Sequence, residues 1–401
     1  MLQQQYISSI KQLFIYFITI GFTFIVMPKN DVSYITSRFI QGVEILFFII
    51  LFIQHYKNTF KCNHTYNIRI NLWWFIYTIN TYLQATNVGL TPIFKWLNVS
   101  IFLLLGSHYW QVDFLKSLKL LSIVFSFLIY LNAILLALYP DGLWIDQEWL
   151  GSGDSTRYLF GNYNQIGFVC LLGITIKAIH TFFTHKGYFS LSMLTLVSII
   201  SVLTVGSMTS TVGLCIMACY LIVHKFIKKI TFAVILYILI YLLFITFVIL
   251  LGSNLENISI AANFIENVLS KEMTFSGRTG IWSNAINLIN QRPWTGYGVQ
   301  PIEWNITNLG GSGTHNIWLM LLLQGGIIIC SAFVIIVLYV IRKVIATNSA
   351  EVIVGVVSIC VLLLMSLFET YNLPQIFLLL QLVYYSFITK KEQITIDQEP
   401  I

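Results

Sequence analysis

The residues best suited to chemistry stand in one long polar segment, 252–313, and just after it. Arg278 follows Ser276-Gly277 and precedes a run whose apolar residues recur on one helical face: Ile281, Trp282, Ala285, Ile286 and Ile289. At a helix start, free backbone N–H groups and a guanidinium together favour an anion. The pattern therefore predicts that Arg278 binds phosphate or another anion, and the alternative is a solvated or lipid-bound loop arginine.

His315 is the candidate for proton transfer. It follows the flexible stretch 310–314 and, with Asn316, opens a long apolar run. Histidine has an unperturbed pKa of about 6.5 and can remove a proton from a sugar hydroxyl. A membrane-interface histidine with its ring toward water is the structural alternative. The acids Glu303, Asp154 and Glu148 stay open as other bases.

A second polar segment, 140–162, holds one cation, Arg157, among several acids. It continues into Phe160-Gly161-Asn162-Tyr163-Asn164-Gln165. A plain salt bridge would account for Arg157. If its side chain instead faces a cavity together with Arg278, the two arginines would clamp a diphosphate.

A third motif, residues 292–298, reads Arg-Pro-Trp-Thr-Gly-Tyr-Gly. Its glycines permit a tight backbone, and its aromatic rings would lie at the membrane interface or stack on a sugar. No Asp-x-Asp pair, Walker loop or Rossmann glycine signature occurs, so nucleotide-dependent chemistry is disfavoured and no metal or cofactor is expected.

The elements that position these residues are membrane helices. The chain has 401 residues, 57% apolar and 9% charged, which leaves too little polar surface for a soluble core of this size. Its apolar runs are continuous and reach the length of about 20 residues that crosses a bilayer. We therefore predict an all-α polytopic transmembrane bundle with about 12 spans, in a single domain, 1–401. The expected spans are 11–27, 37–55, 70–84, 93–110, 117–139, 163–182, 190–205, 210–224, 230–251, 314–341, 350–367 and 373–389.

The distribution of basic residues predicts the orientation. Most Lys and Arg fall in alternate short loops, which places both termini in the cytoplasm. The two polar segments, 140–162 and 252–313, then face outward, and the larger one contains a further amphipathic run at 256–272. The net charge of +6 is explained by the membrane and indicates no nucleic-acid partner.

The residues quoted above occur in an order that resembles the O-antigen ligase and polysaccharide polymerase family. The resemblance rests on Ser276-Gly277-Arg278, Trp282, Ala285, Pro293, Gly296, Gly298, His315-Asn316 and Gln324-Gly325-Gly326. It extends to the helix count, the topology and the stretch from Arg157 to Asn164. One departure is that the family often has a Ser-Arg pair where this chain reads Gly206-Ser207-Met208-Thr209-Ser210-Thr211. Arg292 or Lys271 would then replace the missing cation.

The resemblance implies a metal-independent glycosyltransferase of the bacterial plasma membrane. Its substrate would be a polyprenyl-diphosphate-linked oligosaccharide, with membrane lipids around it and a chain-length regulator and a flippase as further candidate partners. By position, His315 and Arg278 would be catalytic. Arg157, Arg278, Asn164, Arg292, Trp282 and Asn316 would bind diphosphate or glycan.

Two functions within the family and one outside it remain open. A repeat-unit polymerase for capsule, exopolysaccharide or O-antigen is favoured over a ligase, because the Ile-, Asn- and Lys-rich composition weakly indicates a source outside lipopolysaccharide-making bacteria. A lipid-linked oligosaccharide flippase or transporter is the alternative from another class. It is disfavoured because Glu44 is the only acid well inside a span, Glu369 lies near an outer end, and no proline interrupts a span.

Overall fold

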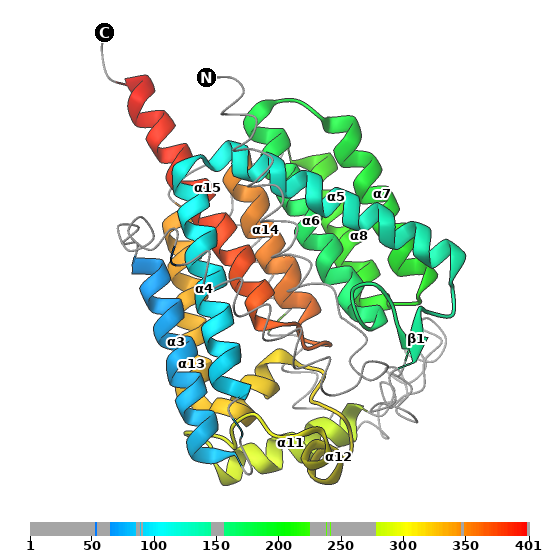
Figure 1. The fold of residues 1–401 in the computed structure, drawn as a ribbon, viewed down its shortest axis with the longest axis vertical. Helices are drawn as coiled ribbons and strands as arrows, with labels where there is room; N and C mark the ends of the chain where they lie inside the picture. The colour runs from blue at the N-terminus through cyan, green and yellow to red at the C-terminus, as the bar shows by residue number, and fades with distance from the viewer. Residues whose placement is uncertain are drawn as a thin grey trace.

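The computed structural model describes residues 65–85, 89, 91–145, 156–224, 278–345 and 349–398, together with Ile53, Ile238 and Tyr241. These residues form a nearly all-α bundle with one short hairpin (Figure 1). The helices are α3 (Thr65–Gln84), α4 (Thr91–Val112), α5 (Phe114–Leu138), α6 (Tyr163–Thr184), α7 (Tyr188–Thr204), α8 (Met208–Val223), α11 (Arg278–Gln291), α12 (Ile302–Leu309), α13 (Ile317–Ile345), α14 (Ala350–Met365) and α15 (Leu373–Gln398). The hairpin pairs β1 (Trp144–Ile145) with β2 (Thr156–Arg157) in antiparallel register.

Each predicted span in the described part of the chain corresponds to one of these helices, but α3 begins at Thr65 rather than 70, and α15 continues to Gln398 rather than ending at 389. The predicted spans 11–27, 37–55 and 230–251, and the amphipathic run 256–272, lie wholly or almost wholly outside the described residues. Helices α5, α6 and α13 are long and apolar enough to cross a membrane, and α7, α8 and α14 are shorter apolar helices. The all-α membrane architecture is therefore confirmed in outline, and the number of twelve spans stays a prediction.

Helix α6 lies at the centre of one half of the bundle, where it packs against α5, α7, α8 and α14. Small residues allow these close approaches. A Cβ atom at Gly167 would come within 2.1 Å of the Ser210 side chain on α8, and one at Gly173 within 2.5 Å of Ile129 on α5. The other half contains α3, α4, α13 and α15, joined by aromatic contacts of Trp73 with the rings of Phe333 and Phe377.

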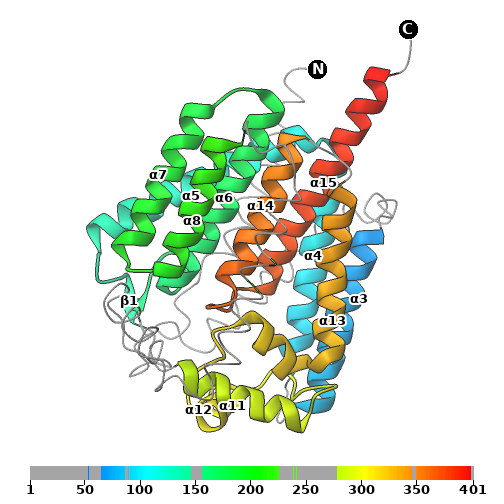
Figure 2. The ribbon, with the colours of Figure 1, turned by 180° about the vertical axis from the view of Figure 1, so that it is seen from behind.

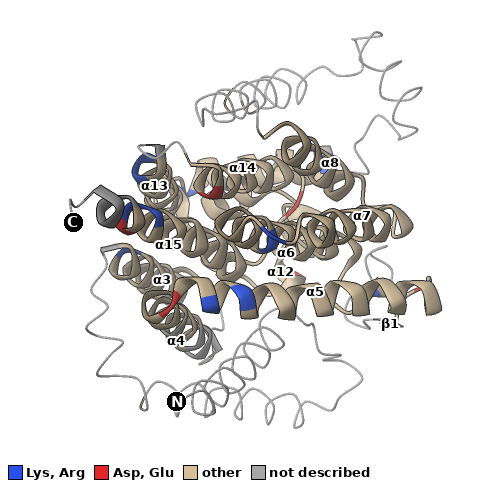
Figure 3. Ribbon diagram, turned by 90° about the horizontal axis from the view of Figure 1, so that it is seen from above, with Lys and Arg blue, Asp and Glu red and all other residues tan. Residues whose placement is uncertain are grey.

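The two ends of the bundle differ in charge. Helices α11 and α12 cover one end, which we call the α11 end (Figures 1 and 2). At the opposite end, Arg69 of α3 and Lys343 of α13 lie over the ring of Tyr339, and Lys390 of α15 pairs with Glu351 of α14. Figure 3 shows basic residues on several helices in the view onto this end. The orientation that the sequence predicts depends on this asymmetry.

Helix α13 is broken at Gly326, a feature that the sequence did not predict. Gly326 has φ +63° and ψ −166°, and the first part of the helix, yellow in Figure 2, runs at an angle to the orange second part. Residues 293–298, which we call the strap, lie in the break. The backbone N–H groups of Ile327 and Ile328 donate to the carbonyls of Pro293 and Trp294 at 2.8 and 3.4 Å.

The strap also covers the other side of the break. The backbone N–H of Tyr297 donates to Leu323 at 2.8 Å, and that of Gly298 donates to Gln324 at 2.9 Å. A broken helix inside a bilayer is tolerated only when such freed groups find partners. A Cβ at Gly296 would meet the Leu323 carbonyl at 2.4 Å, so the glycines of this motif permit backbone-to-backbone packing.

Candidate functional site

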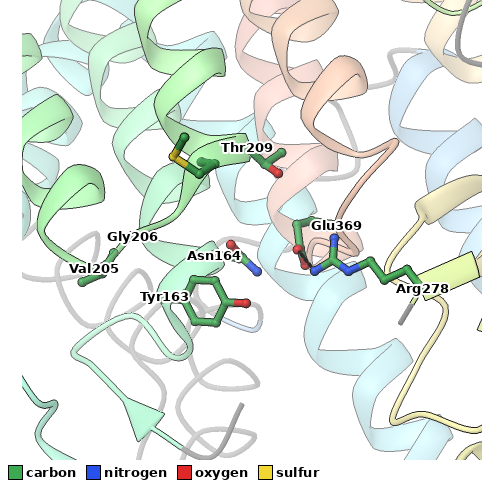
Figure 4. Close-up of a pocket in the computed structure, with 8 residues that line it drawn as sticks. Tyr163, Asn164, Val205, Gly206, Thr209, Arg278 and Glu369 are labelled. Atoms are coloured by element: carbon green, nitrogen blue, oxygen red, sulfur yellow. Dashed lines mark hydrogen bonds and ion pairs between the residues drawn. The ribbon is translucent and has the colours of Figure 1, made fainter. Parts of the chain in front are cut away.

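A polar cavity of 340 Å³ opens at the α11 end (Figure 4). Four parts of the chain build it: the first turn of α6, the turn from α7 into α8, the first residue of α11 and the loop between α14 and α15. Its lining residues are Tyr163, Asn164, Val205, Gly206, Met208, Thr209, Arg278 and Glu369. Because these parts are far apart in sequence, the cavity exists only in the folded bundle.

Arg278 and Glu369 form an ion pair at the edge of this cavity. The Nη2 atom of Arg278 lies 2.5 Å from Oε1 of Glu369, and its Nη1 donates to the backbone carbonyl of Phe368. The two side chains are 17% and 5% exposed, so the pair is largely shielded from solvent. In such a setting an arginine and a carboxylate attract one another more strongly than at an open surface. Arg278 stands at the start of α11, as the sequence predicts.

His315 lies near the other oxygen of the same carboxylate. Its Nδ1 atom lies 3.6 Å from Oε2 of Glu369, and its side chain is 17% exposed. This distance is longer than a hydrogen bond, so the two groups are neighbours with a charge interaction that requires a protonated ring. The two residues that the sequence predicts to be catalytic, Arg278 and His315, therefore converge on one buried glutamate.

The backbone fixes His315 in an uncommon conformation. Its φ of +47° is left-handed, a region in which histidine is enriched among non-glycine residues. Both neighbours are held. The carbonyl of Thr314 accepts from Nε1 of Trp282 at 2.8 Å, and Nδ2 of Asn316 donates to Leu367 at 2.9 Å.

Asn316 also caps the following helix. Its Oδ1 accepts from the backbone N–H groups of Trp318 and Leu319 at 2.9 and 3.1 Å, the geometry of a side-chain N-cap. Asn316 and Trp282 were predicted to contact substrate. In this structure both are buried and their polar atoms hold the segment that carries His315.

Asn164 joins the cavity to a small network of hydroxyl groups. The Oγ of Ser207 donates to Oδ1 of Asn164 at 2.8 Å and lies 2.7 Å from Oγ of Ser210. Burial raises the pKa of the nearby Tyr371 well above its usual value; the Glu369 carboxylate adds to this shift, and Ser210 and Arg278 oppose it. The Tyr371 phenol beside this network therefore stays protonated over the physiological pH range.

The other two predicted arginines lie elsewhere. Arg157 is buried in the β-hairpin, where Nη1 contacts the carbonyl of Thr156 at 3.3 Å, and it is not among the cavity-lining residues. Arg292 is exposed beyond the far end of α11, about 20 Å from Arg278 by the rise of an α-helix. It lies 3.5 Å from Oε1 of Gln84 and over the ring of Tyr297.

Glu369 is the site residue that sequence reasoning missed. It was noted only as an acid near the end of a span, although the polar sequence Phe368-Glu369-Thr370-Tyr371-Asn372 between two apolar helices was a signal. The stretch from Gly206 to Thr209, where the family often has an arginine, does line the cavity but contributes a hydroxyl group and no cation. Lys271 lies outside the described residues.

Comparison with known proteins gives a family match over part of the chain. Residues 193–334 match a family model described as O-Antigen ligase. The match includes the α7–α8 turn, Arg278 and His315, and it ends before Glu369. No curated protein matches the chain. Among the described residues, no group of three or more His, Cys, Asp or Glu side chains could hold a metal ion.

Proposed function

We propose that this chain, which carries an O-antigen ligase family domain at residues 193–334, is a polysaccharide repeat-unit polymerase. It transfers glycan from a polyprenyl-diphosphate-linked oligosaccharide to an acceptor sugar hydroxyl. The single observation that carries the proposal is the convergence of Arg278 and His315 on Glu369 beside a polar cavity. A ligase of the same family would use the same residues with a different acceptor.

The reaction requires one bond to break and one to form. The acceptor oxygen attacks the anomeric carbon, and the bond from that carbon to the carrier phosphate oxygen breaks. The acceptor proton passes to His315, and the new negative charge stays on the lipid diphosphate, where Arg278 stabilises it. The step as written uses no metal ion or cofactor.

The cavity has a size that suits the reacting part of such a donor. Its 340 Å³ is at the lower end of small-molecule pockets. It would hold a diphosphate and the first part of a sugar, while the polyprenyl chain lies in the membrane. Tyr163 and Thr209, at the cavity wall, provide a ring and a hydroxyl group for a sugar.

Charge supports an outward-facing site. The basic residues Arg69, Lys343 and Lys390 gather at the end opposite the cavity, which is the cytoplasmic end by the positive-inside rule. The α11 end then faces outward from a bacterial plasma membrane, and both termini are cytoplasmic. Membrane lipids surround the bundle, and a chain-length regulator and a flippase are candidate partners.

One observation favours the transporter alternative. Transporters often bind substrate at broken membrane helices, and α13 is broken at Gly326. In this protein the strap satisfies the backbone groups on both sides of the break, so they are not available to a ligand or ion. The break is therefore better explained as the joint that sets the direction of the first part of α13, which begins beside His315.

Expression in a host that makes the lipid-linked repeat tests the proposal. We expect the wild type to give a ladder of glycan lengths. Arg278→Ala and His315→Ala should leave single repeats on the carrier, and Arg157→Ala tests the second predicted arginine. Lys390→Ala, at the opposite end, is the matched control and should keep the ladder. An intact ladder in Arg278→Ala and His315→Ala at normal membrane levels would contradict the site. Repeats stranded on the cytoplasmic leaflet without the protein would favour a transporter.

A further inference from the structure

We propose that Glu369 is a positioning residue that exchanges between two partners during the reaction. Its carboxylate neutralises Arg278, and a donor diphosphate that binds Arg278 displaces it, so that the carboxylate moves onto His315. This inference rests on the proposed function for the identity of the donor. The exchange itself involves only the side chains of Arg278, Glu369 and His315.

The first step is competition for Arg278. Both terminal nitrogens of its guanidinium are engaged, Nη2 with Oε1 of Glu369 and Nη1 with the carbonyl of Phe368. Arg278 also lines the cavity, so an anion that enters the cavity meets a cation already neutralised by a carboxylate. A diphosphate carries more negative charge than a carboxylate and can bind the guanidinium through two oxygens. It can therefore replace Glu369, at a cost in affinity.

The second step is the destination of the released carboxylate. Its other oxygen, Oε2, already lies 3.6 Å from Nδ1 of His315. A charge-assisted hydrogen bond is about 0.8 Å shorter than this separation. The backbone on both sides of His315 is held by the bonds of Thr314 and Asn316, so we assign the movement to side chains, chiefly that of Glu369.

The exchange links donor binding to the base. When His315 takes the acceptor proton, its ring becomes a cation, and a carboxylate on Nδ1 stabilises that cation and holds the ring in place. Without donor, the same carboxylate is committed to Arg278 at 2.5 Å. The base is therefore fully supported only when a diphosphate occupies the cavity, so proton transfer from the acceptor is favoured only when the donor that it attacks is bound.

A binding measurement tests the first step without any activity. Purified full-length protein in detergent is titrated with inorganic diphosphate and with a sugar-free polyprenyl diphosphate by calorimetry. Glu369→Gln keeps the size of the side chain and removes its charge. We expect both ligands to bind about 10-fold more tightly, because the competing carboxylate is gone. Unchanged or weaker binding in a folded variant would overturn the exchange.

A matched control exists in the same chain. Glu351 is also buried, 8% exposed, and its Oε1 lies 2.9 Å from Nζ of Lys390 at the opposite end of the bundle. Glu351→Gln makes the same chemical change beside a different cation. Its affinity for diphosphate should equal that of the wild type, and equal tightening there would show a general charge effect and overturn the exchange.

Turnover should change in the opposite direction to binding. With the lipid-linked repeat as donor, Glu369→Gln should lower kcat about 10- to 100-fold while the donor KM falls. Glu369→Asp keeps the charge and should recover part of kcat. A merely structural role predicts that affinity and kcat decline together, and that result would contradict the proposal.

The two proposals can fail separately. If the wild type makes no polymer or ligated product but Glu369→Gln still tightens diphosphate binding, the proposed function is wrong and the competition at Arg278 stands. If the wild type is active but the variant loses affinity and turnover together, the function stands and the exchange is wrong. Size-exclusion profiles of Glu369→Gln and Glu369→Asp identify the folded fraction used in each assay.

Discussion

Two buried glutamates flank α14, and they have different surroundings. Glu351, in the first turn of the helix, pairs with Lys390 at 2.9 Å, its one cationic partner among the described residues. Glu369, in the loop after the helix, has Arg278 at 2.5 Å and His315 at 3.6 Å. Their side chains are 8% and 5% exposed, so burial does not separate them. The two glutamates differ in the number and kind of their partners.

The difference supports the proposed site at the α11 end. The Glu351 pair is complete, and Lys390 also lies 5.7 Å above the ring of Phe183. Glu369 lies between a cation, Arg278, and a candidate base, His315, and it lines a cavity. A carboxylate with one partner holds a fold together, whereas a carboxylate between a phosphate-binding cation and a base can change partners.

The largest expected effect separates the two cations. Arg278→Met should lower glycan transfer about 1,000-fold, because it removes the positive charge that stabilises the departing diphosphate. Lys390→Met should leave transfer within about 3-fold per folded molecule, since surface and distant charges contribute little to a remote site. Product formation is measured with the lipid-linked repeat at matched protein levels. Equal losses in both variants would contradict the assignment of glycan transfer to the α11 end.

The next prediction concerns the strap that fixes the geometry of the α11 end. Gly326→Ala places a Cβ 2.2 Å from the backbone of Trp294, at a residue whose φ is +63°. We expect a loss of stability of about 3 kcal/mol from strain and displaced backbone, and a loss of transfer because the first part of α13 no longer positions His315. Thermal unfolding and transfer assays measure the two effects.

Gly280→Ala is the control for that substitution. Among the described residues, and apart from the backbone of α11 itself, no atom lies within 4 Å of a Cβ at Gly280, which is in α11 near Arg278. The change should raise the free energy of unfolding slightly, by up to about 1 kcal/mol, through helix propensity. If Gly326→Ala is as harmless as Gly280→Ala, the strap does not determine the geometry of the site.

The sequence predicted the elements of this comparison better than their contacts. Apolar runs alone located the helices from α3 to α8 and from α13 to α15, because length and hydropathy are local properties, although they missed the polar end of α15 after residue 389. Arg278 and His315 were identified from residue type and order. The sequence could not place Arg157 and Arg292, because the position of a loop arginine depends on contacts between distant segments.

Glu369 and the break in α13 show why the remaining features of the site could not be predicted from the sequence. A single acid at the end of a span is compatible with solvent, lipid or an ion pair, and only the fold brings it to Arg278, 91 positions away. The Gln324-Gly325-Gly326 sequence was read as part of a continuous helix. The break in α13 depends on the strap, which supplies carbonyl and N–H partners from another part of the chain, and the sequence does not show this contact.

A smaller effect is expected on stability at the opposite end. Lys390→Met leaves Glu351 buried without its cation and should lower the free energy of unfolding by about 1–2 kcal/mol, a reduced cost because the lysine is 25% exposed. The double change Glu351→Gln with Lys390→Met should recover most of that loss. Thermal unfolding in detergent measures the stability of both variants. If the double variant does not recover stability, Glu351 and Lys390 have other important partners.

The smallest effect is expected at Arg292, the alternative source of the cation that the family often has at the α7–α8 turn. Its side chain is exposed, and its contact with Gln84 is 3.5 Å long. Since Arg292 stands about 20 Å from Arg278 along α11, its charge is largely screened from the cavity at physiological ionic strength. Arg292→Ala should therefore change transfer by less than about 2-fold in the same assay as Arg278→Met. A loss comparable to that of Arg278→Met would move the diphosphate site toward Arg292. Glu369 would then be a structural acid like Glu351, and the comparison between the two ends would fail.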